Sequence, residues 1–258
     1  MKAIWKGNLS LALVTIPIKM YTATQKKDIH FRMLHKKCST PLSYERFCPK
    51  CNEEVPWEDV VHGYEYEKGK FVIITDDEIE RIPIKTSKNI EILCFVDISK
   101  VPAIYFEKAY YLEPAEGGEK AYALLREVMK ELSKVALAKI TMRDKEHIAI
   151  INVHSDTLVL HTLYYADEVV DPQKLNIPKD VEFDRREIEL AQELIQHFSG
   201  EFEVENYKDE FREAIMELIK QKIEGKEIKI SPKKEVEKVI GLMDALKMSL
   251  ERTKKKAG

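Results

Sequence analysis

The stretch His35–Cys51, HKKCSTPLSYERFCPKC, contains three of the four cysteines of the chain and one histidine. These residues form two close pairs, H-x2-C and C-x2-C, which are separated by nine residues. A C-x2-C turn presents two thiolates to one ion, and structural Zn²⁺ sites hold the ion with four such donors in a tetrahedron. The spacing therefore predicts a zinc knuckle with the ligands His35, Cys38, Cys48 and Cys51.

The histidine is the ligand that the spacing specifies least, because His30 or His62 could replace His35. Four protein ligands leave no open position for water, so the zinc is expected to be structural and not catalytic. The alternative is that the cysteines are ordinary core residues, which are often buried. Their clustering favours the metal. Cys94 stands apart in an apolar run and is expected in the core.

The chain has 258 residues, enough for one large or two small domains with a substantial core. Its first residues, MKAIWKGNLSLALVTIPIK, place a lysine before apolar residues, as a signal peptide does. However, Lys6, Asn8 and Pro17 interrupt the apolar part, and no small-residue cleavage site follows. No apolar run approaches membrane-spanning length. We therefore expect a cytoplasmic protein without a membrane partner, where reduced thiols favour metal binding over disulfides.

The net charge of −3 hides an uneven distribution of charge along the chain. Residues 25–50 contain seven Lys or Arg and two acidic residues, a net charge of +5. Residues 51–82 contain three basic and ten acidic residues, a net charge of −7, and residues 225–258 contain ten basic and five acidic residues, a net charge of +5. Such blocks could form a basic lane within an acidic surface, although solvated charged faces are the alternative interpretation.

Alternating apolar residues predict a core made mainly of β-strands. Residues 8–21 alternate with a change of phase at Thr15, which predicts one long strand with a bulge. The other expected strands are short strands around a turn at 67–70, strands at 89–97 and 103–114, and a hairpin with its turn at 154–156. A short helix capped by Thr75 is expected at 76–81.

Longer helices follow Gly117-Gly118 and fill the C-terminal part of the chain. The first of them is expected to place five residues on one face: Ala121, Leu124, Leu125, Val128 and Leu132. Asp184 is a good N-cap for a second helix, which Gly200 ends. A third is expected to place five residues on one face: Phe211, Ile215, Leu218, Ile219 and Lys222.

A last helix is expected after Ser231-Pro232, with a narrow apolar row that contains Val236, Val239, Met243, Leu246 and Leu250. Such a row suits a partner helix, and packing on the chain's own barrel is the alternative. This helix and the aromatic strand at 103–112 are candidate dimer contacts. The tail ERTKKKAG is expected to contact DNA or a partner loosely, if at all.

Five blocks of sequence occur in one order between Ala3 and Val170. They are AIWKGNLSLALVTIPIKMYTAT, FRMLHKK, VPWEDVVHGYEYEKGKFVIITDDEIE, YYLEP followed by KAYALLREVM, and the run from MRDKEHIAII to LVLHTLYYADEV. Together they resemble the prokaryotic Ku family. The resemblance implies a nucleoid-associated homodimeric ring that binds double-stranded DNA ends without sequence specificity. Such a ring recruits an ATP-dependent DNA ligase of the ligase D type for non-homologous end joining.

The resemblance also implies an α+β fold with a β-barrel core, an arm that bridges the DNA duplex, and C-terminal helices that embrace the partner subunit. We assign residues 1–183 to the core with its bridging arm, in which 35–51 form the zinc knuckle, and 184–258 to the helical arm and basic tail. The zinc is inferred from the spacing of its ligands alone, because the resemblance does not imply it.

A protein that binds DNA of any sequence needs Lys and Arg side chains that neutralise phosphates. The best candidates flank the predicted metal site or end the first strand: Lys19, Lys36, Lys37, Arg46 and Lys50. A loop held by zinc would fix these cations in place and reduce the cost of ordering them on binding. Surface lysines that merely lie near a knuckle are the alternative.

No pattern of an active site is present in the sequence. It has no Gly-rich phosphate loop, no G-x-S-x-G and no H-E-x-x-H, so we do not expect an enzyme. A metal-dependent nuclease could use Asp76, Asp77 and Glu80, but consecutive acids on a helix point in different directions, which favours a solvated, capped turn. The alternative function is a zinc-ribbon protein-interaction module without preference for DNA ends, serving transcription or chaperone work.

Overall fold

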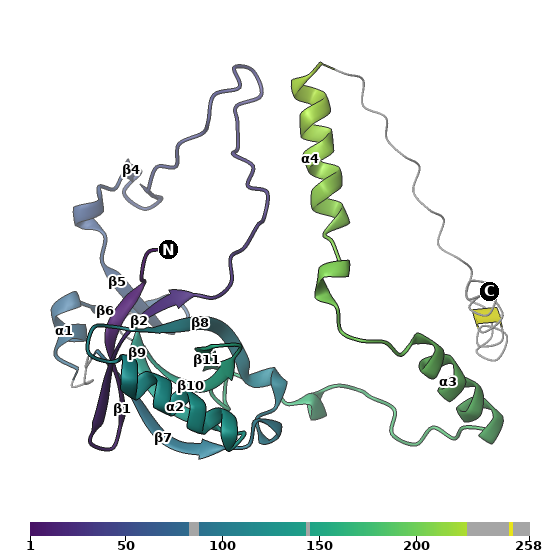
Figure 1. Cartoon of the computed structure of the whole chain (residues 1–258). Coiled ribbons are helices and arrows are strands. Elements are labelled where there is room, and N and C mark those ends of the chain that lie inside the picture. Colours follow the sequence, from purple (N-terminus) through teal and green to yellow (C-terminus); the bar gives the residue numbers. More distant parts are fainter. Residues whose placement is uncertain (83–87, 143–144, 226–247, 250–258) are drawn as a thin grey trace. The chain divides into compact units, whose positions relative to one another are not determined.

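The computed structural model describes most of the chain, namely residues 1–82, 88–142, 145–225 and 248–249. The chain divides into two structural units, Met1–Asp171 and Pro172–Gly258. The first unit contains a closed β-barrel in which the strands follow one another in the order β1-β2-β8-β11-β10-β9-β7 (Figure 1). This confirms the prediction of a barrel core with additional helices. Within the described part of the chain, no helix is long and apolar enough to cross a membrane.

Seven strands form the barrel: β1 (Trp5–Leu11), β2 (Val14–Thr22), β7 (Asn89–Val96), β8 (Phe106–Pro114), β9 (Val135–Met142), β10 (Lys145–His154) and β11 (Thr157–Leu163). Neighbouring strands are antiparallel except β1 and β7, which pair in parallel and close the barrel. At this closure the side chain of Asn89 donates a hydrogen bond of 2.7 Å to Oγ of Ser10, and the amide of Asn8 donates to the carbonyl of Lys88 at 2.9 Å.

The predicted single strand over residues 8–21 is wrong, because the chain reverses within it. Strands β1 and β2 form a tight hairpin in which Ala12 adopts the left-handed conformation with φ of 52°. The phase of the apolar alternation changes because the turn separates the inward row of β1 from that of β2. In this hairpin Leu9 lies opposite Ile16 and Lys6 lies opposite Lys19.

Apolar side chains from all seven strands form the main core cluster of the barrel, and Val135, Ile150 and Leu163 belong to a second, smaller cluster. The fully buried large members of the main cluster are Leu9, Ile18, Met20, Ile90, Leu112, Ile140, Ile151, Leu158 and Leu160. Helix α2 (Glu119–Glu131) packs against the barrel strands (Figure 1), and its Tyr122 and Met129 belong to the same cluster. The hydroxyl of Tyr122 donates to the carbonyl of Leu112 at 2.6 Å, which satisfies a buried polar group.

Helix α2 follows Gly117-Gly118 as predicted, but its expected apolar face is not the one that packs on the barrel, and the prediction that Cys94 lies in the core is wrong. The apolar face expected on α2 is only partly buried, since Leu124 and Leu132 are 65% and 61% exposed. The helix is rotated so that Tyr122, whose hydroxyl reaches backbone groups of the strands, faces the barrel instead. Cys94 is exposed because the pairing of β7 with β9 shifts between Ile92 and Cys94, and this bulge interrupts the inward alternation.

A long segment lies outside the barrel between β2 and β7 (Figure 1). Its elements are β3 (Phe47–Cys48), β4 (Glu53–Glu54), the 3₁₀ helix η1 (Trp57–Asp59), β5 (His62–Glu67), β6 (Lys70–Ile74) and α1 (Asp76–Glu80). As predicted, β5 and β6 pair around a turn, and Thr75 caps α1 with a reciprocal bond to Glu78. We call residues 24–75 the arm; apart from Ile29, Cys48 and Val55, all of them are exposed.

Short 3₁₀ helices, η2 (Ile98–Lys100) and η3 (Ala103–Tyr105), connect β7 to β8. The described part of the second unit contains η4 (Pro172–Lys174), α3 (Arg185–Phe198), η5 (Val204–Asn206) and α4 (Glu210–Ile223). Asp184 caps α3 as predicted, because its side chain accepts from the amide of Arg186 at 2.8 Å. The last predicted helix and the basic tail lie outside the described residues, apart from Met248 and Ser249.

Candidate nucleic-acid interface and metal-binding hairpins

The first pair of predicted zinc ligands lies in a hairpin of the arm. Leu34 and Pro41 form its base, and the amide of His35 donates to the carbonyl of Thr40 at 2.9 Å. This turn brings Nδ1 of His35 to 3.2 Å from Sγ of Cys38. The hydroxyl and backbone of Thr40 lower the pKa of Cys38, which favours the thiolate that a metal binds. The local fold therefore produces one pair of donors.

The second pair lies in the turn between β3 and β4. The amide of Asn52 donates to the carbonyl of Cys48 at 2.8 Å, and Asn52 adopts the left-handed conformation that such a turn requires. Backbone N–H groups of Cys51 and Lys50, together with the Cys51 thiol, lower the pKa of Cys48. Its neighbour Cys48 in turn raises the pKa of Cys51, as expected for two thiols that share one proton.

The structure does not join these two pairs into one site. Within residues 1–82, 88–142, 145–225 and 248–249, no three His, Cys, Asp or Glu side chains form a group that could hold a metal. The alternative ligands His30 and His62 are both exposed, the latter on β5. The donors nevertheless fit zinc by their chemistry, since each hairpin offers two adjacent soft or borderline donors. The zinc site stays a prediction.

Four of the predicted DNA-contacting cations lie on the same two hairpins. Lys36 and Lys37 occupy the turn of the first hairpin, and Lys50 occupies the turn between β3 and β4; all three are exposed. Arg46 precedes β3 and places its guanidinium 4.1 Å from the centroid of the Trp57 ring. None of the four forms an ion pair with another residue in the described part of the chain. Their charge therefore remains available to phosphates.

The fifth predicted cation, Lys19, lies on the barrel and not on the arm. It is half-buried on β2, between Lys6 of β1 and Glu113 of β8. Its inward neighbours on β2 are buried, so Lys19 faces outward together with Lys6. A single strand over residues 8–21 would not place Lys6 beside Lys19; the change of phase at Thr15 is the signal in the sequence of the turn that does.

Many large apolar side chains of the arm are exposed to solvent. Phe31, Tyr44 and Trp57 are 71%, 78% and 68% exposed, and several others are also exposed: Met33, Leu42, Phe47, Tyr64, Phe71 and Ile73. Large apolar side chains exposed in such number are consistent with a region that a partner covers. The arm thus combines unpaired cations with surface that is suited to burial.

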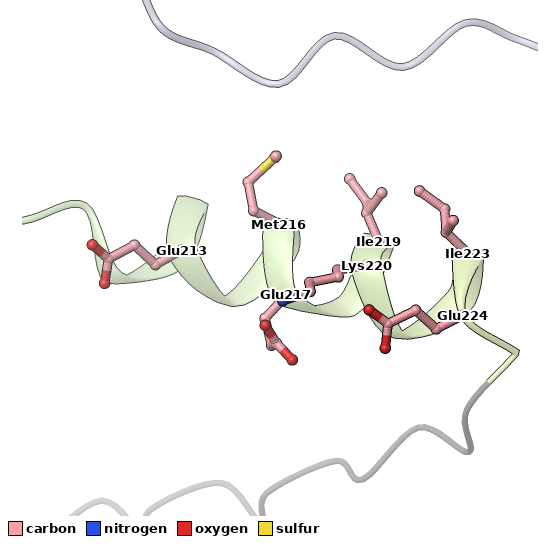
Figure 2. A pocket seen from close by; sticks show the side chains of 7 residues that line it. All are labelled: Glu213, Met216, Glu217, Ile219, Lys220, Ile223 and Glu224. Atoms are coloured by element: carbon pink, nitrogen blue, oxygen red, sulfur yellow. The ribbon is translucent and has the colours of Figure 1, made fainter.

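Helix α4 carries a second exposed apolar row. Figure 2 shows that Met216, Ile219 and Ile223 project from the same side of the helix, whereas Glu217 projects from another side. These three apolar residues are three and then four positions apart in the sequence, which is the spacing typical of a helix–helix contact. Met216 is 53% and Ile223 is 81% exposed, so the described part of the chain leaves this row largely uncovered.

Comparisons with known proteins agree with the barrel. The family model of Ku, described as the Ku70/Ku80 beta-barrel domain, matches residues 10–190. A protein of Archaeoglobus fulgidus is 42% identical over 257 residues, which cover 98% of this chain and all of the relative. One of Bacillus subtilis is 37% identical over 259 residues, covering 99% of this chain and 83% of the relative.

A protein of Symbiobacterium thermophilum is 40% identical over 252 residues, which cover 97% of this chain but 63% of the relative. The present chain thus spans less than two thirds of that protein. All three relatives are named non-homologous end joining protein Ku. The names state a role in end joining.

Proposed function

The chain belongs to the Ku family of non-homologous end joining proteins, and from this premise we propose that it binds the ends of double-stranded DNA as a homodimeric ring. Its role is binding and not catalysis. The observation that carries the proposal is the exposed arm. It extends from the closed barrel and carries four of the predicted cations, which form no ion pair with a described carboxylate. A segment with little core of its own gains stability when a partner covers it.

DNA contact through the arm would be made mainly to phosphates. Lys36, Lys37 and Lys50 lie at the tips of two hairpins, where a side chain can approach the backbone of any sequence. Phosphate contacts position a protein on the duplex without reading its bases, so they suit a protein that must accept any broken end. On the barrel, Lys19 and Lys6 add a second pair of cations, which would extend this contact.

Zinc would hold the two hairpins of the arm together. We propose His35 and Cys38 of one hairpin and Cys48 and Cys51 of the other as its ligands. When bound, the ion supplies a cross-link between two segments that otherwise bury little apolar surface. The arm's own residues then present their cations in a fixed arrangement, which reduces the entropy lost when DNA binds.

A ring requires two copies of the chain, because one half-ring does not encircle a duplex. The exposed row Met216, Ile219 and Ile223 on α4 suits a contact with a partner helix. Phe31, Tyr44 and Phe71 of the arm suit a second contact between the two copies. A closed ring would resist sideways release from DNA, so it would favour entry at ends. Recruitment of an ATP-dependent DNA ligase of the ligase D type, in the cytoplasm at the nucleoid, completes the proposed role.

The test is a gel shift at moderate salt that compares a linear blunt duplex with the same sequence as a closed circle. We expect binding to the linear duplex, no binding to the circle, and more protein bound per molecule as the linear fragment becomes longer. Equal binding to circles would contradict the ring. It would favour the alternative function, a zinc-ribbon protein-interaction module without preference for ends.

A further inference from the structure

The arm contains a hollow of about 380 Å³ whose position is separate from the basic hairpin tips. Side chains of η1, β5, β6 and the link at residues 60–61 surround it, together with the N-cap of α1; they are Trp57, Val60, Val61, His62, Ile74 and Thr75. This volume lies within the range of roughly 300–1,000 Å³ that is typical of binding pockets. Four of the six lining residues are large and apolar.

Local hydrogen bonds hold the walls of the hollow in place. The amide of Val60 donates to the carbonyl of Trp57 at 3.2 Å and turns the chain toward β5. His62 pairs with Ile74 in the register of β5 and β6, and Thr75 is fixed by the capping box of α1. The hollow is therefore defined by secondary structure and not by a loose loop.

Its apolar surface is open to a partner. Trp57 and Val61 are 68% and 61% exposed, and Val60 and Ile74 are 39% and 37% exposed. The guanidinium of Arg46 lies 4.1 Å from the ring centroid of Trp57 and restrains the indole, but Arg46 does not line the hollow. A restrained, accessible tryptophan beside aliphatic side chains is typical of the residues that dominate binding energy at protein interfaces.

The surroundings of the hollow are acidic. Glu58 and Asp59 directly follow Trp57 and are exposed. The carboxylate of Glu78 accepts hydrogen bonds from the amide and hydroxyl of Thr75 at 2.9 and 3.0 Å. These bonds lower the pKa of Glu78 and keep it ionised at neutral pH. Residues 51–82 as a whole have a net charge of −7, which favours cations over phosphate, and Arg46, on the ring of Trp57, is a cation next to the hollow.

We propose that this hollow is the docking site for a basic peptide segment of a partner protein. One large apolar side chain of the peptide enters the hollow, and Lys or Arg residues on either side of it contact Glu58, Asp59 and Glu78. The apolar anchor supplies most of the affinity, whereas the charges on the rim supply orientation and rate of association. Of the cations proposed to contact DNA, Arg46 adjoins this site through the ring of Trp57, and docking of the peptide does not require the proposed binding of DNA ends.

The two tryptophans of the chain allow a direct measurement. In the full-length Trp5→Phe variant, Trp57 is the only tryptophan, and its emission reports on the hollow. We expect the synthetic peptide Arg-Lys-Leu-Lys-Arg to shift this emission to shorter wavelength in a saturable way. Replacement of its leucine by glycine should raise Kd at least about tenfold, because the apolar contact is lost. The measurement is made without DNA.

Variants separate the anchor from the charges. Glu58→Gln together with Asp59→Asn should raise Kd by roughly tenfold at low salt, because two rim charges are lost. The matched control, Glu116→Gln together with Glu131→Gln, removes the same charge from exposed positions beside and on α2 and should leave Kd unchanged. Val61→Thr should weaken the leucine peptide and leave the glycine peptide unaffected.

Three results would overturn the proposal. Equal binding of the leucine and glycine peptides would mean that the hollow takes no anchor, and an equal loss in the control variant would mean that only net charge matters. A shift of Trp57 emission by a single-stranded oligonucleotide, with none by the peptide, would make the hollow a nucleobase site instead. Failure to bind linear duplex in the separate gel shift would count against the proposed function alone.

Discussion

The backbone N–H of Leu158 donates a hydrogen bond of 2.7 Å to the hydroxyl of Tyr122, which joins the start of β11 to helix α2. The same hydroxyl donates to the carbonyl of Leu112 on β8 and lies 3.1 Å from Oγ1 of Thr157. One buried oxygen of α2 thus satisfies backbone groups on two strands. This contact explains why the helix turns Tyr122, and not Leu124, toward the barrel.

The Tyr122→Phe variant should be less stable, since Leu158 would keep a buried N–H without its partner. An unsatisfied buried donor costs about 1–3 kcal/mol in the free energy of unfolding. Urea unfolding followed by circular dichroism measures this loss. The control is Tyr207→Phe, at a side chain that is 79% exposed, where no change is expected. Equal stability of Tyr122→Phe and the parent chain would contradict the role assigned to this hydroxyl.

Gly7 lies where β1 approaches the chain that leads into β7. A Cβ atom at this position would lie 2.2 Å from the carbonyl oxygen of Lys88 and 2.4 Å from the ring of Trp5. Gly7→Ala should therefore disturb the parallel closure of the barrel and destabilise it by about 1–3 kcal/mol, as overpacking does. Gly200→Ala meets no atom within 4 Å and serves as the control in thermal unfolding.

Metal analysis of the purified chain tests the predicted zinc site. We expect about one zinc per chain, because the four proposed donors would make one tetrahedral site. Cys48→Ser should lose the metal, since a serine hydroxyl is a poor substitute for a thiolate. Cys94→Ser is the matched control and should retain it, because Cys94 lies on β7 of the barrel. Less than half an equivalent of zinc in the parent chain would refute the site.

Salt dependence of DNA binding tests the cations of the arm. Replacing Lys36, Lys37 and Arg46 together by Ala should weaken binding to linear duplex. It should also reduce the slope of log K against log salt by up to about three times 0.9, which corresponds to three lost phosphate contacts. An unchanged slope would remove these residues from the interface.

The control for this experiment removes three positive charges elsewhere. Lys120 and Lys130 of α2 and Lys174 of η4 are exposed, and none forms an ion pair with a residue that the structure describes. Their joint replacement by Ala should leave the slope close to that of the parent chain. If the slope falls as much as in the variant of Lys36, Lys37 and Arg46, net charge and not the position of the cations determines binding.

Stability should depend on pH through His161. Burial lowers the pKa of its imidazole, with a smaller contribution from His154, and its ring packs edge-on against Phe106 at 5.3 Å between centroids. Below the ordinary pKa of about 6.5 the imidazole is protonated in the unfolded chain but stays neutral in the folded chain until the pH reaches the lower, folded pKa. Stability is therefore complete above about pH 6.5 and is lost as the pH falls through the lower, folded pKa.

The His161→Phe variant removes this titration, so its Tm should fall less than that of the parent chain between about pH 7.5 and pH 5.5. His147, whose pKa burial also lowers, retains its own contribution in the variant. Parallel curves for both chains over this interval would mean that His161 carries its proton equally in the folded and unfolded states.

By itself the sequence determined the caps and turns that depend on interactions between residues close together in the chain. The cap of Thr75 on α1, the N-cap at Asp184 and the hairpin that turns at Ser155 all have the predicted form, because each rests on bonds within a few residues. The two close pairs, His35 with Cys38 and Cys48 with Cys51, are formed locally for the same reason.

Only the tertiary structure decided which distant residues become neighbours. The reversal at Ala12 places Lys6 beside Lys19, and the bulge of β7 exposes Cys94. Leu158 and Leu112 select Tyr122 as a buried residue of α2, although apolar periodicity favoured another face. Periodicity reports that one side of an element is apolar. Closure of the barrel decides which side is covered, because buried backbone groups must find partners there.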